Sequence, residues 1–100
     1  MPVGKVRKNR KQNLGMIEAI HMAGGQVKLG QRLGIPQSYV SKMLNDQPSH
    51  RQALWVSEVM GVPRGLLRPD IWGHELDPET REAAIRGALY RQPAYVFRAP

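Results

Sequence analysis

The sequence contains no cysteine, few aromatic residues and no long apolar run. Without cysteine there is no disulfide and no thiolate metal site, and this absence fits a reducing compartment. The chain has no stretch of 18 apolar residues and no apolar segment of a signal peptide, so we expect a soluble, cytoplasmic protein that does not enter a membrane. With 41% hydrophobic residues among 100, the chain can form one small core, which oligomerisation would help to stabilise.

Signatures of catalysis and of cofactor binding are also missing. There is no HExxH or GxSxG motif, and no paired acids fall on one predicted face. His21 has no second histidine or cysteine at metal-ligand spacing. Gly24–Gly25 is not followed by the Gly-Lys-Ser/Thr of a phosphate-binding loop. The sequence therefore predicts that the protein is not an enzyme and has no metal site and no cofactor.

The net charge is +7 and the isoelectric point is about 10.4, which indicates a polyanionic partner. Residues 1–12 carry +5 of this charge and no acid, which leaves +2 for the rest of the chain. These basic residues are Lys5, Arg7, Lys8, Arg10 and Lys11. We expect a flexible basic arm that contacts DNA phosphates or the minor groove. The alternative is a solvated tail that only aids solubility.

Gln26 to Asn45 contains two short helical patterns on either side of one glycine. The first pattern has an apolar side at helical spacing, formed by Val27, Leu29, Gly30 and Leu33. Gly34 can adopt the positive φ that ends a helix. Ile35 is expected to lie between the two segments, and Pro36 suits the first turn of the second helix because its missing N–H would have no partner there.

The second helical pattern, Pro36 to Asn45, has one apolar and one polar side. The apolar side is formed by Val40, Met43 and Leu44. The other side carries hydrogen-bonding groups and no acid, in Gln37, Ser38, Ser41, Lys42 and Asn45. Amide and hydroxyl groups of this kind can bond the edges of bases in the major groove. An ordinary amphipathic helix with a solvated face is the alternative.

This arrangement resembles the helix-turn-helix of the Cro and lambda-repressor class. Counted from Gln26, the family has a small residue at the fifth place, glycine at the ninth, and aliphatic residues at the tenth and fifteenth; the sequence has Gly30, Gly34, Ile35 and Val40 there. The resemblance implies an all-α fold, a small helical bundle in which Gly30 lets the two helices approach. A helix hairpin that does not bind DNA is the alternative.

Residues downstream narrow the resemblance. The segment Gly65 to Trp72, with its LRPD-I-W ending, and the pair Gly24–Gly25 are similar to the YdaS-like branch of prophage and plasmid regulators, some of which are labelled antitoxins. The likeness covers Leu14 to Trp72. We therefore expect an arm at residues 1–12, a DNA-binding domain at 13–73, and a C-terminal helix and tail at 74–100 for dimerisation or partner binding.

Capping signals predict the other helices. Asn13 is expected to cap a helix from Leu14 to about Ala23, with its core side formed by Leu14, Ile17 and Ile20. Ser49 and Gln52 form a capping-box pattern before a helix from His50 to Met60. A short helix should follow around Arg64 to Leu67. Leu66, Leu67, Ile71 and Trp72 should close the core.

A last helix is predicted from Asp77-Pro78 to about Arg91. Its narrow apolar strip is formed by Ile85, Ala88 and Leu89. We expect this strip in a subunit contact, and the alternative is that it packs on its own domain. The segment from Tyr95 to Phe97 has residues that favour a β-strand. It would form an edge strand across a dimer, or it would be a tail.

The function expected from these features is that of a sequence-specific regulator of transcription, a repressor that binds double-stranded DNA. By resemblance, a homodimer or higher homo-oligomer contacts a pseudo-palindromic operator. Bases would be contacted by Gln37, Ser38, Tyr39, Ser41, Lys42 and Asn45. Phosphates would be contacted by Gln26, Lys28 and Arg32 together with the arm. The alternatives are an antitoxin-like or adaptor protein that binds a protein partner through the region beyond Trp72, and non-specific packaging of nucleic acid.

Overall fold

Helices make up most of residues 11–89, the part of the chain that the computed structural model describes. They are α1 (Leu14–Ala23), α2 (Gln26–Leu33), α3 (Gln37–Asn45), α4 (His50–Met60), α5 (Arg64–Leu67), α6 (Pro69–Trp72), the 3-10 turn η2 (Gly73–Glu75) and α7 (Pro78–Arg86). The predicted all-α class is confirmed. One short antiparallel ladder joins β1 (Lys11–Gln12) to β2 (Ala88–Leu89), with Lys11 opposite Leu89.

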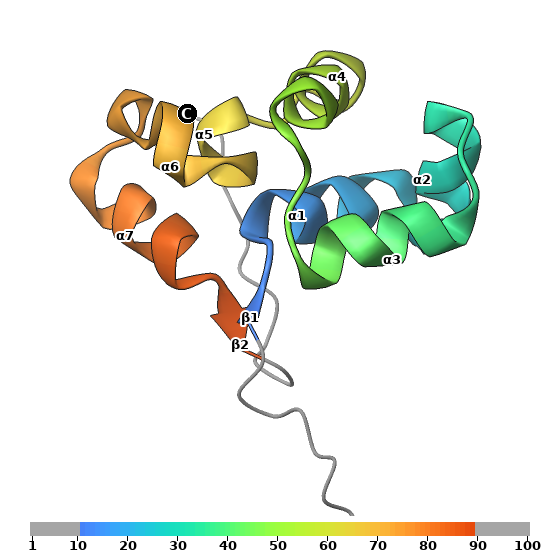
Figure 1. The fold of residues 1–100 in the computed structure, drawn as a ribbon, viewed down its shortest axis with the longest axis horizontal. Helices are drawn as coiled ribbons and strands as arrows, with labels where there is room; N and C mark the ends of the chain where they lie inside the picture. Colours follow the sequence, from blue (N-terminus) through green and yellow to red (C-terminus); the bar gives the residue numbers. More distant parts are fainter. Residues whose placement is uncertain (1–10, 90–100) are drawn as a thin grey trace, which may run out of the picture.

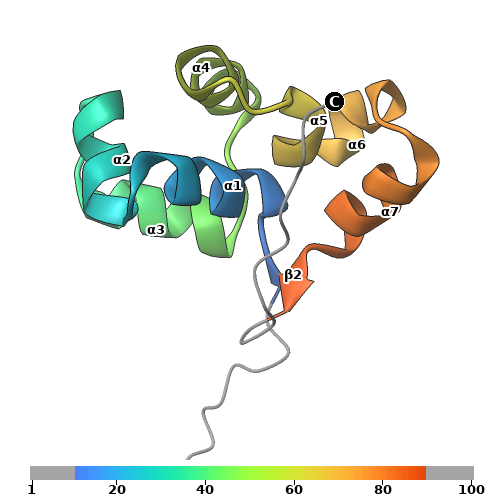
Figure 2. The ribbon, with the colours of Figure 1, turned by 180° about the vertical axis from the view of Figure 1, so that it is seen from behind.

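The helices form two groups on either side of α1. Figure 1 shows α2 and α3 at one end of the molecule, and α5, α6 and α7 at the other. Figure 2 shows the same arrangement from behind, with α4 along the upper edge in both views. Helix α1 touches both groups and also α4. The ladder lies at the opposite edge from α4.

Asn13 caps α1 as predicted and also links the two groups of helices. Its Oδ1 accepts a hydrogen bond from the Met16 N–H at 2.9 Å. Its Nδ2 donates to the Leu67 carbonyl at 2.8 Å, across 54 positions of the chain. Because the side chain is buried, losing either bond would leave a polar group without a partner away from water.

The other predicted boundaries before residue 68 agree with the structure, with one small difference. Ser49 and Gln52 form the capping box of α4, with bonds of 3.1 and 2.9 Å. Helices α4 and α5 have the predicted bounds. Pro36 is the N-cap of α3 rather than its first residue, because its ψ of 156° is extended. Helix α6 was not predicted.

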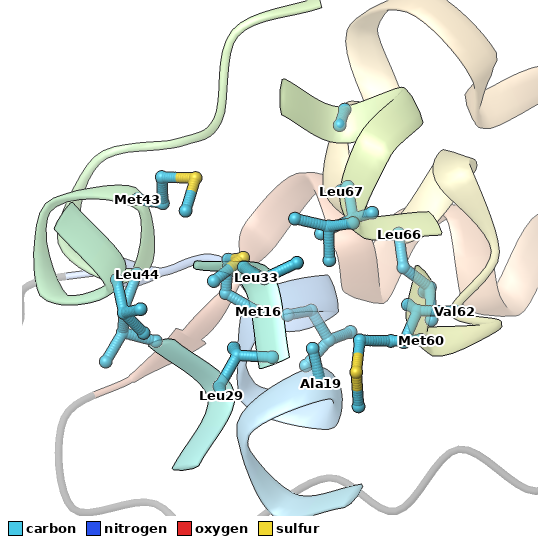
Figure 3. Packing of buried hydrophobic residues seen from close by; sticks show 14 of the residues in the cluster. Met16, Ala19, Leu29, Leu33, Met43, Leu44, Met60, Val62, Leu66 and Leu67 are labelled. Atoms are coloured by element: carbon cyan, nitrogen blue, oxygen red, sulfur yellow. The ribbon is translucent and has the colours of Figure 1, made fainter. Parts of the chain in front are cut away.

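The core centres on α1, and here the predicted stripe is incomplete. Leu14 is buried, and Ile17 and Ile20 are partly buried and pack against the core as predicted. Met16 and Ala19, which lie outside the stripe, are fully buried. Figure 3 shows Met16 and Ala19 among side chains from both groups of helices. The reason is that α1 is covered on several sides, so a single three-residue stripe underestimates its buried surface. The fully buried residues around it include Leu29, Val40, Val56, Val62, Leu66 and Leu67.

Two predicted apolar surfaces differ from expectation. Val27, assigned to the apolar side of its helix, is 53% exposed. The last helix ends at Arg86 and not near Arg91, because Gly87 turns the chain with φ 71°. Ala88–Leu89 then pairs with β1 as a strand. The helical strip of Ile85 with Ala88 and Leu89 is therefore wrong, and the predicted segment Tyr95–Phe97 lies outside the described residues.

Candidate nucleic-acid interface

Helices α2 and α3 meet at a tight turn built on two glycines. Gly34 has φ 74° and ends α2. The Ile35 N–H donates to the Gly30 carbonyl at 2.9 Å. A Cβ on buried Gly30 would lie 2.6 Å from the Ile35 carbonyl oxygen. The close approach therefore requires glycine at position 30, and the left-handed conformation favours glycine at position 34.

One side of α3 anchors the helix and leaves the other in solvent. Val40, Met43 and Leu44 are buried in the core. The exposed side carries side chains that donate or accept hydrogen bonds: Gln37, Ser38, Tyr39 and Lys42. No acidic residue lies within α3, and Asp46 follows as its C-cap. The exposed side therefore offers amide, hydroxyl and ammonium groups without a fixed negative charge.

The first residues of α2 and α3 lie next to each other. The Gln37 Nε2 donates to the Gln26 Oε1 at 3.5 Å, on the surface of the molecule. The long distance and the exposure make this a weak bond. The Gln37 oxygen and the Gln26 amide nitrogen take no part in this bond. Two residues predicted to contact DNA differently, one at a base and one at a phosphate, are thus adjacent.

Ser41 and Asn45 are engaged with their own protein. The Asn45 Nδ2 donates to the Ser41 carbonyl at 3.0 Å and to its Oγ at 3.4 Å. The Gln12 Nε2 donates to the Asn45 Oδ1 at 3.2 Å. Both residues of α3 are only partly exposed. Their contact with bases stays a prediction, but the hydrogen bonds of Asn45 join the end of α3 to β1.

The basic residues of α2 and α3 form no ion pair with another described residue. Lys28, Arg32 and Lys42 are exposed and take part in neither of the two ion pairs of the described region. Those pairs, Arg64–Glu75 and Arg68–Asp70, lie on the other group of helices. Of the arm, Lys11 belongs to β1, beside the end of α3. The predicted contacts of Lys5, Arg7, Lys8 and Arg10 lie outside the described residues.

The two ion pairs stabilise the scaffold. Hydrogen bonds from Arg68, at 3.0 and 2.7 Å, lower the pKa of the Asp70 carboxyl. Arg68 also donates to the Pro48 carbonyl at 3.1 Å, which ties the segment before α4 to α6. Bonds from Arg64 likewise lower the pKa of Glu75. The Arg64 guanidinium lies 5.0 Å from the centre of the Trp72 ring.

A pocket of about 360 Å³ lies between α3 and the start of α4. Its lining combines polar and apolar side chains: Tyr39, Lys42, Met43, Asp46, Gln47 and Gln52. Two of the expected base-contacting residues, Tyr39 and Lys42, thus line this pocket. The acid Asp46 lines it as well and marks the limit of the acid-free surface.

Within residues 11–89, no group of three His, Cys, Asp or Glu side chains is close enough to hold a metal ion. In the same residues no helix is long and apolar enough to cross a membrane. The chain matches no protein-family model, no curated protein and no solved structure.

Proposed function

We propose that the protein is a sequence-specific DNA-binding regulator of transcription, a repressor that docks α3 in the major groove. The observation that carries this proposal is the pairing of α2 and α3 around Gly30 and Gly34, with an exposed, acid-free polar side on α3. A helix of about 12 Å diameter fits the major groove. The sequence resemblance to Cro and lambda-repressor helix-turn-helix proteins supports the same function.

In this proposal the exposed residues of α3 contact bases, and residues of α2 contact phosphates. Gln37 lies at the first turn of α3, and a glutamine amide can bond both N6 and N7 of adenine. Ser38, Tyr39 and Lys42 are the other base-contacting candidates with free surface. Gln26 at the start of α2 would bond a phosphate while its Oε1 holds Gln37 in place. Lys28 and Arg32 add charge to the phosphate contacts.

The LRPD-I-W segment has a supporting role in this proposal. Its residues form α5 and α6, where Leu66, Leu67 and Trp72 are buried. Its Arg68 and Asp70 form an ion pair, and the Leu67 carbonyl accepts from Asn13. The LRPD-I-W segment thus holds the start of α1 in position, and α2 and α3 pack on α1.

Selection of bound fragments from a random duplex library, followed by sequencing, tests the function. We expect one enriched site, and a pseudo-palindrome if two copies bind together. Specific binding should exceed binding to random duplex by at least about 10³-fold at physiological salt. Equal recovery of all sequences would contradict the proposal and favour non-specific packaging. Recovery of no DNA at low salt would contradict both.

A further inference from the structure

Helix α4 carries more exposed large apolar residues than any other described helix. Leu54, Trp55 and Val59 are 36%, 39% and 39% exposed. The remaining large apolar residues exposed within residues 11–89 occur singly, on separate helices: Met22, Val27, Tyr39 and Ile85. Figures 1 and 2 show α4 at the periphery of the fold. Three exposed apolar side chains on one peripheral helix make α4 the described helix on which a contact with another protein is best sought.

The solvent-exposed side of α4 carries a base, Arg51, and an acid, Glu58. Ala53, Val56 and Met60 are buried on the inner side. At about 100° per residue, Arg51 and Glu58 fall opposite that inner side, seven residues or about two turns apart. Leu54 and Trp55 flank the line between them, one on each side. We name Arg51, Leu54, Trp55, Glu58 and Val59 the α4 face.

The order of these charges is unfavourable for a helix alone. An acid near the N-terminus and a base near the C-terminus suit the helix dipole. The first turn of α4 has no acid and the last turn has no base; instead Arg51 lies near the start and Glu58 near the end. Both are exposed, and neither is in an ion pair of the described residues.

We propose that the α4 face binds a second copy of this chain, with the two α4 helices antiparallel. A twofold axis between positions 54 and 55 places Arg51 opposite the partner's Glu58, and Glu58 opposite the partner's Arg51. The same axis keeps each flank on its own side, so Leu54 lies against the partner's Leu54 and Trp55 lies against the partner's Trp55. The contact between Arg51 and Glu58 thus occurs twice, and the two apolar contacts lie on the axis, as the symmetry of a homodimer requires. The pairing also offsets the unfavourable order of charges in each helix.

The size of the face limits how tightly two copies bind. An 11-residue helix is about 16 Å long. Five side chains along that length are fewer than the roughly 20–30 residues that a stable interface uses on each side. We therefore expect association in solution at tens of micromolar or weaker. The association does not depend on binding DNA, so failure of the proposed function leaves it open to test.

Sedimentation equilibrium of the full chain between about 1 and 500 µM tests the pairing by exchange of charge. Arg51→Glu places two acids opposite each other, and Glu58→Arg places two bases opposite each other. Each single variant should therefore associate at least about tenfold more weakly than the natural chain. An equimolar mixture of the two should form a heterodimer, and Arg51→Glu with Glu58→Arg in one chain should restore the homodimer.

Two control variants distinguish association through the α4 face from non-specific hydrophobic association. Met22→Ser removes an exposed apolar side chain of α1 and should leave association unchanged, whereas Trp55→Ser should weaken it. Circular dichroism on each variant verifies that it is folded. The proposal is overturned if the natural chain stays monomeric at 500 µM, if folded single reversals associate as before, or if neither the mixture nor the double exchange regains association.

Discussion

Gly30 and Ile35 face each other across the turn between α2 and α3. The Ile35 N–H donates to the Gly30 carbonyl at 2.9 Å. A methyl group added to the Gly30 Cα would lie 2.6 Å from the Ile35 carbonyl oxygen, which is too close for two nonbonded atoms. The obstacle is backbone and not the end of a flexible side chain, so it cannot move aside cheaply. The spacing of α2 and α3 is thus fixed by the absence of one side chain.

Gly30→Ala should separate α2 from α3 and destabilise the protein. We expect a loss of about 1–3 kcal/mol in the free energy of unfolding, typical of overpacking, measured by urea denaturation. Gly34→Asn is the matched control, since no atom lies within 4 Å of its Cβ position and asparagine tolerates the left-handed conformation. It should cost less than about 1 kcal/mol. Equal losses in the two variants would contradict the close-approach argument.

Gln37→Ala should weaken binding to the selected site by roughly 1–3 kcal/mol and have little effect on random duplex. Gln26→Ala should weaken binding to both. Because their amides are 3.5 Å apart, the double variant should lose less at the selected site than the sum of the single losses. Binding isotherms on the two duplexes measure all three. Additive losses would mean that Gln26 does not orient Gln37.

Gln31 provides the control for these two variants. It is exposed on the same helix as Gln26 but was not assigned to the DNA contact. Gln31→Ala should leave both isotherms unchanged. If Gln31→Ala lost as much affinity as Gln26→Ala, the phosphate contact would have to be assigned to a longer part of α2.

Stability should fall in acid partly through the Arg68–Asp70 pair. Because the fold lowers the pKa of Asp70, the pair contributes fully above the unfolded pKa of about 3.9 and is lost as pH falls through the lower folded value. Asp70→Asn should therefore lower the melting midpoint at pH 7 by roughly 2–4 °C, since the carboxylate is 54% exposed and water screens the pair.

The same substitution should lessen the drop in melting midpoint between pH 5 and pH 2. Glu82→Gln removes an exposed carboxylate that belongs to neither ion pair, so it should leave both quantities nearly unchanged. A drop in Asp70→Asn as steep as in the natural chain would assign the acid sensitivity to other groups, such as Glu75, whose pKa is also lowered.

Local signals in the sequence predicted the helix boundaries well, because a cap or a glycine acts within one turn. Asn13 and the Ser49–Gln52 box lie where those signals place them. Gly87 carries the same kind of signal at the end of α7, with a positive φ. The periodicity of the apolar residues beyond it predicts a continuing helix instead, so the two signals conflict at this position.

Contacts between distant segments could not be predicted in this way. Nothing near Asn13 in the sequence indicates that its amide bonds the carbonyl of Leu67. The ladder between β1 and β2 joins the two ends of the described chain, and neither two-residue strand has a pattern of its own. In the candidate interface, the exposed side of α3 followed from its periodicity, but the bonds of Asn45 to Ser41 and Gln12 did not.

The last prediction concerns the basic arm. Because Lys11 belongs to the ladder of β1 and β2, the variant must leave that residue in place. Deleting residues 1–11 would remove Lys11, and with it the strand that pairs with β2. Exchange of Lys5, Arg7, Lys8 and Arg10 for glutamine removes four charges and keeps β1. If these residues lie along phosphates, each contact changes the slope of log K against log salt by about 0.9 for duplex DNA.

The exchanged variant should therefore flatten the slope by up to about 3.6 units per subunit, and by about half that if only some charges reach a phosphate. Affinity should fall alike on the selected site and on random duplex, because phosphate contacts carry no sequence information. An arm in the minor groove would also lose discrimination at positions flanking the site, since it senses groove width and A·T content. Titrations at several salt concentrations separate these outcomes, and an unchanged slope would make the arm a solvated tail.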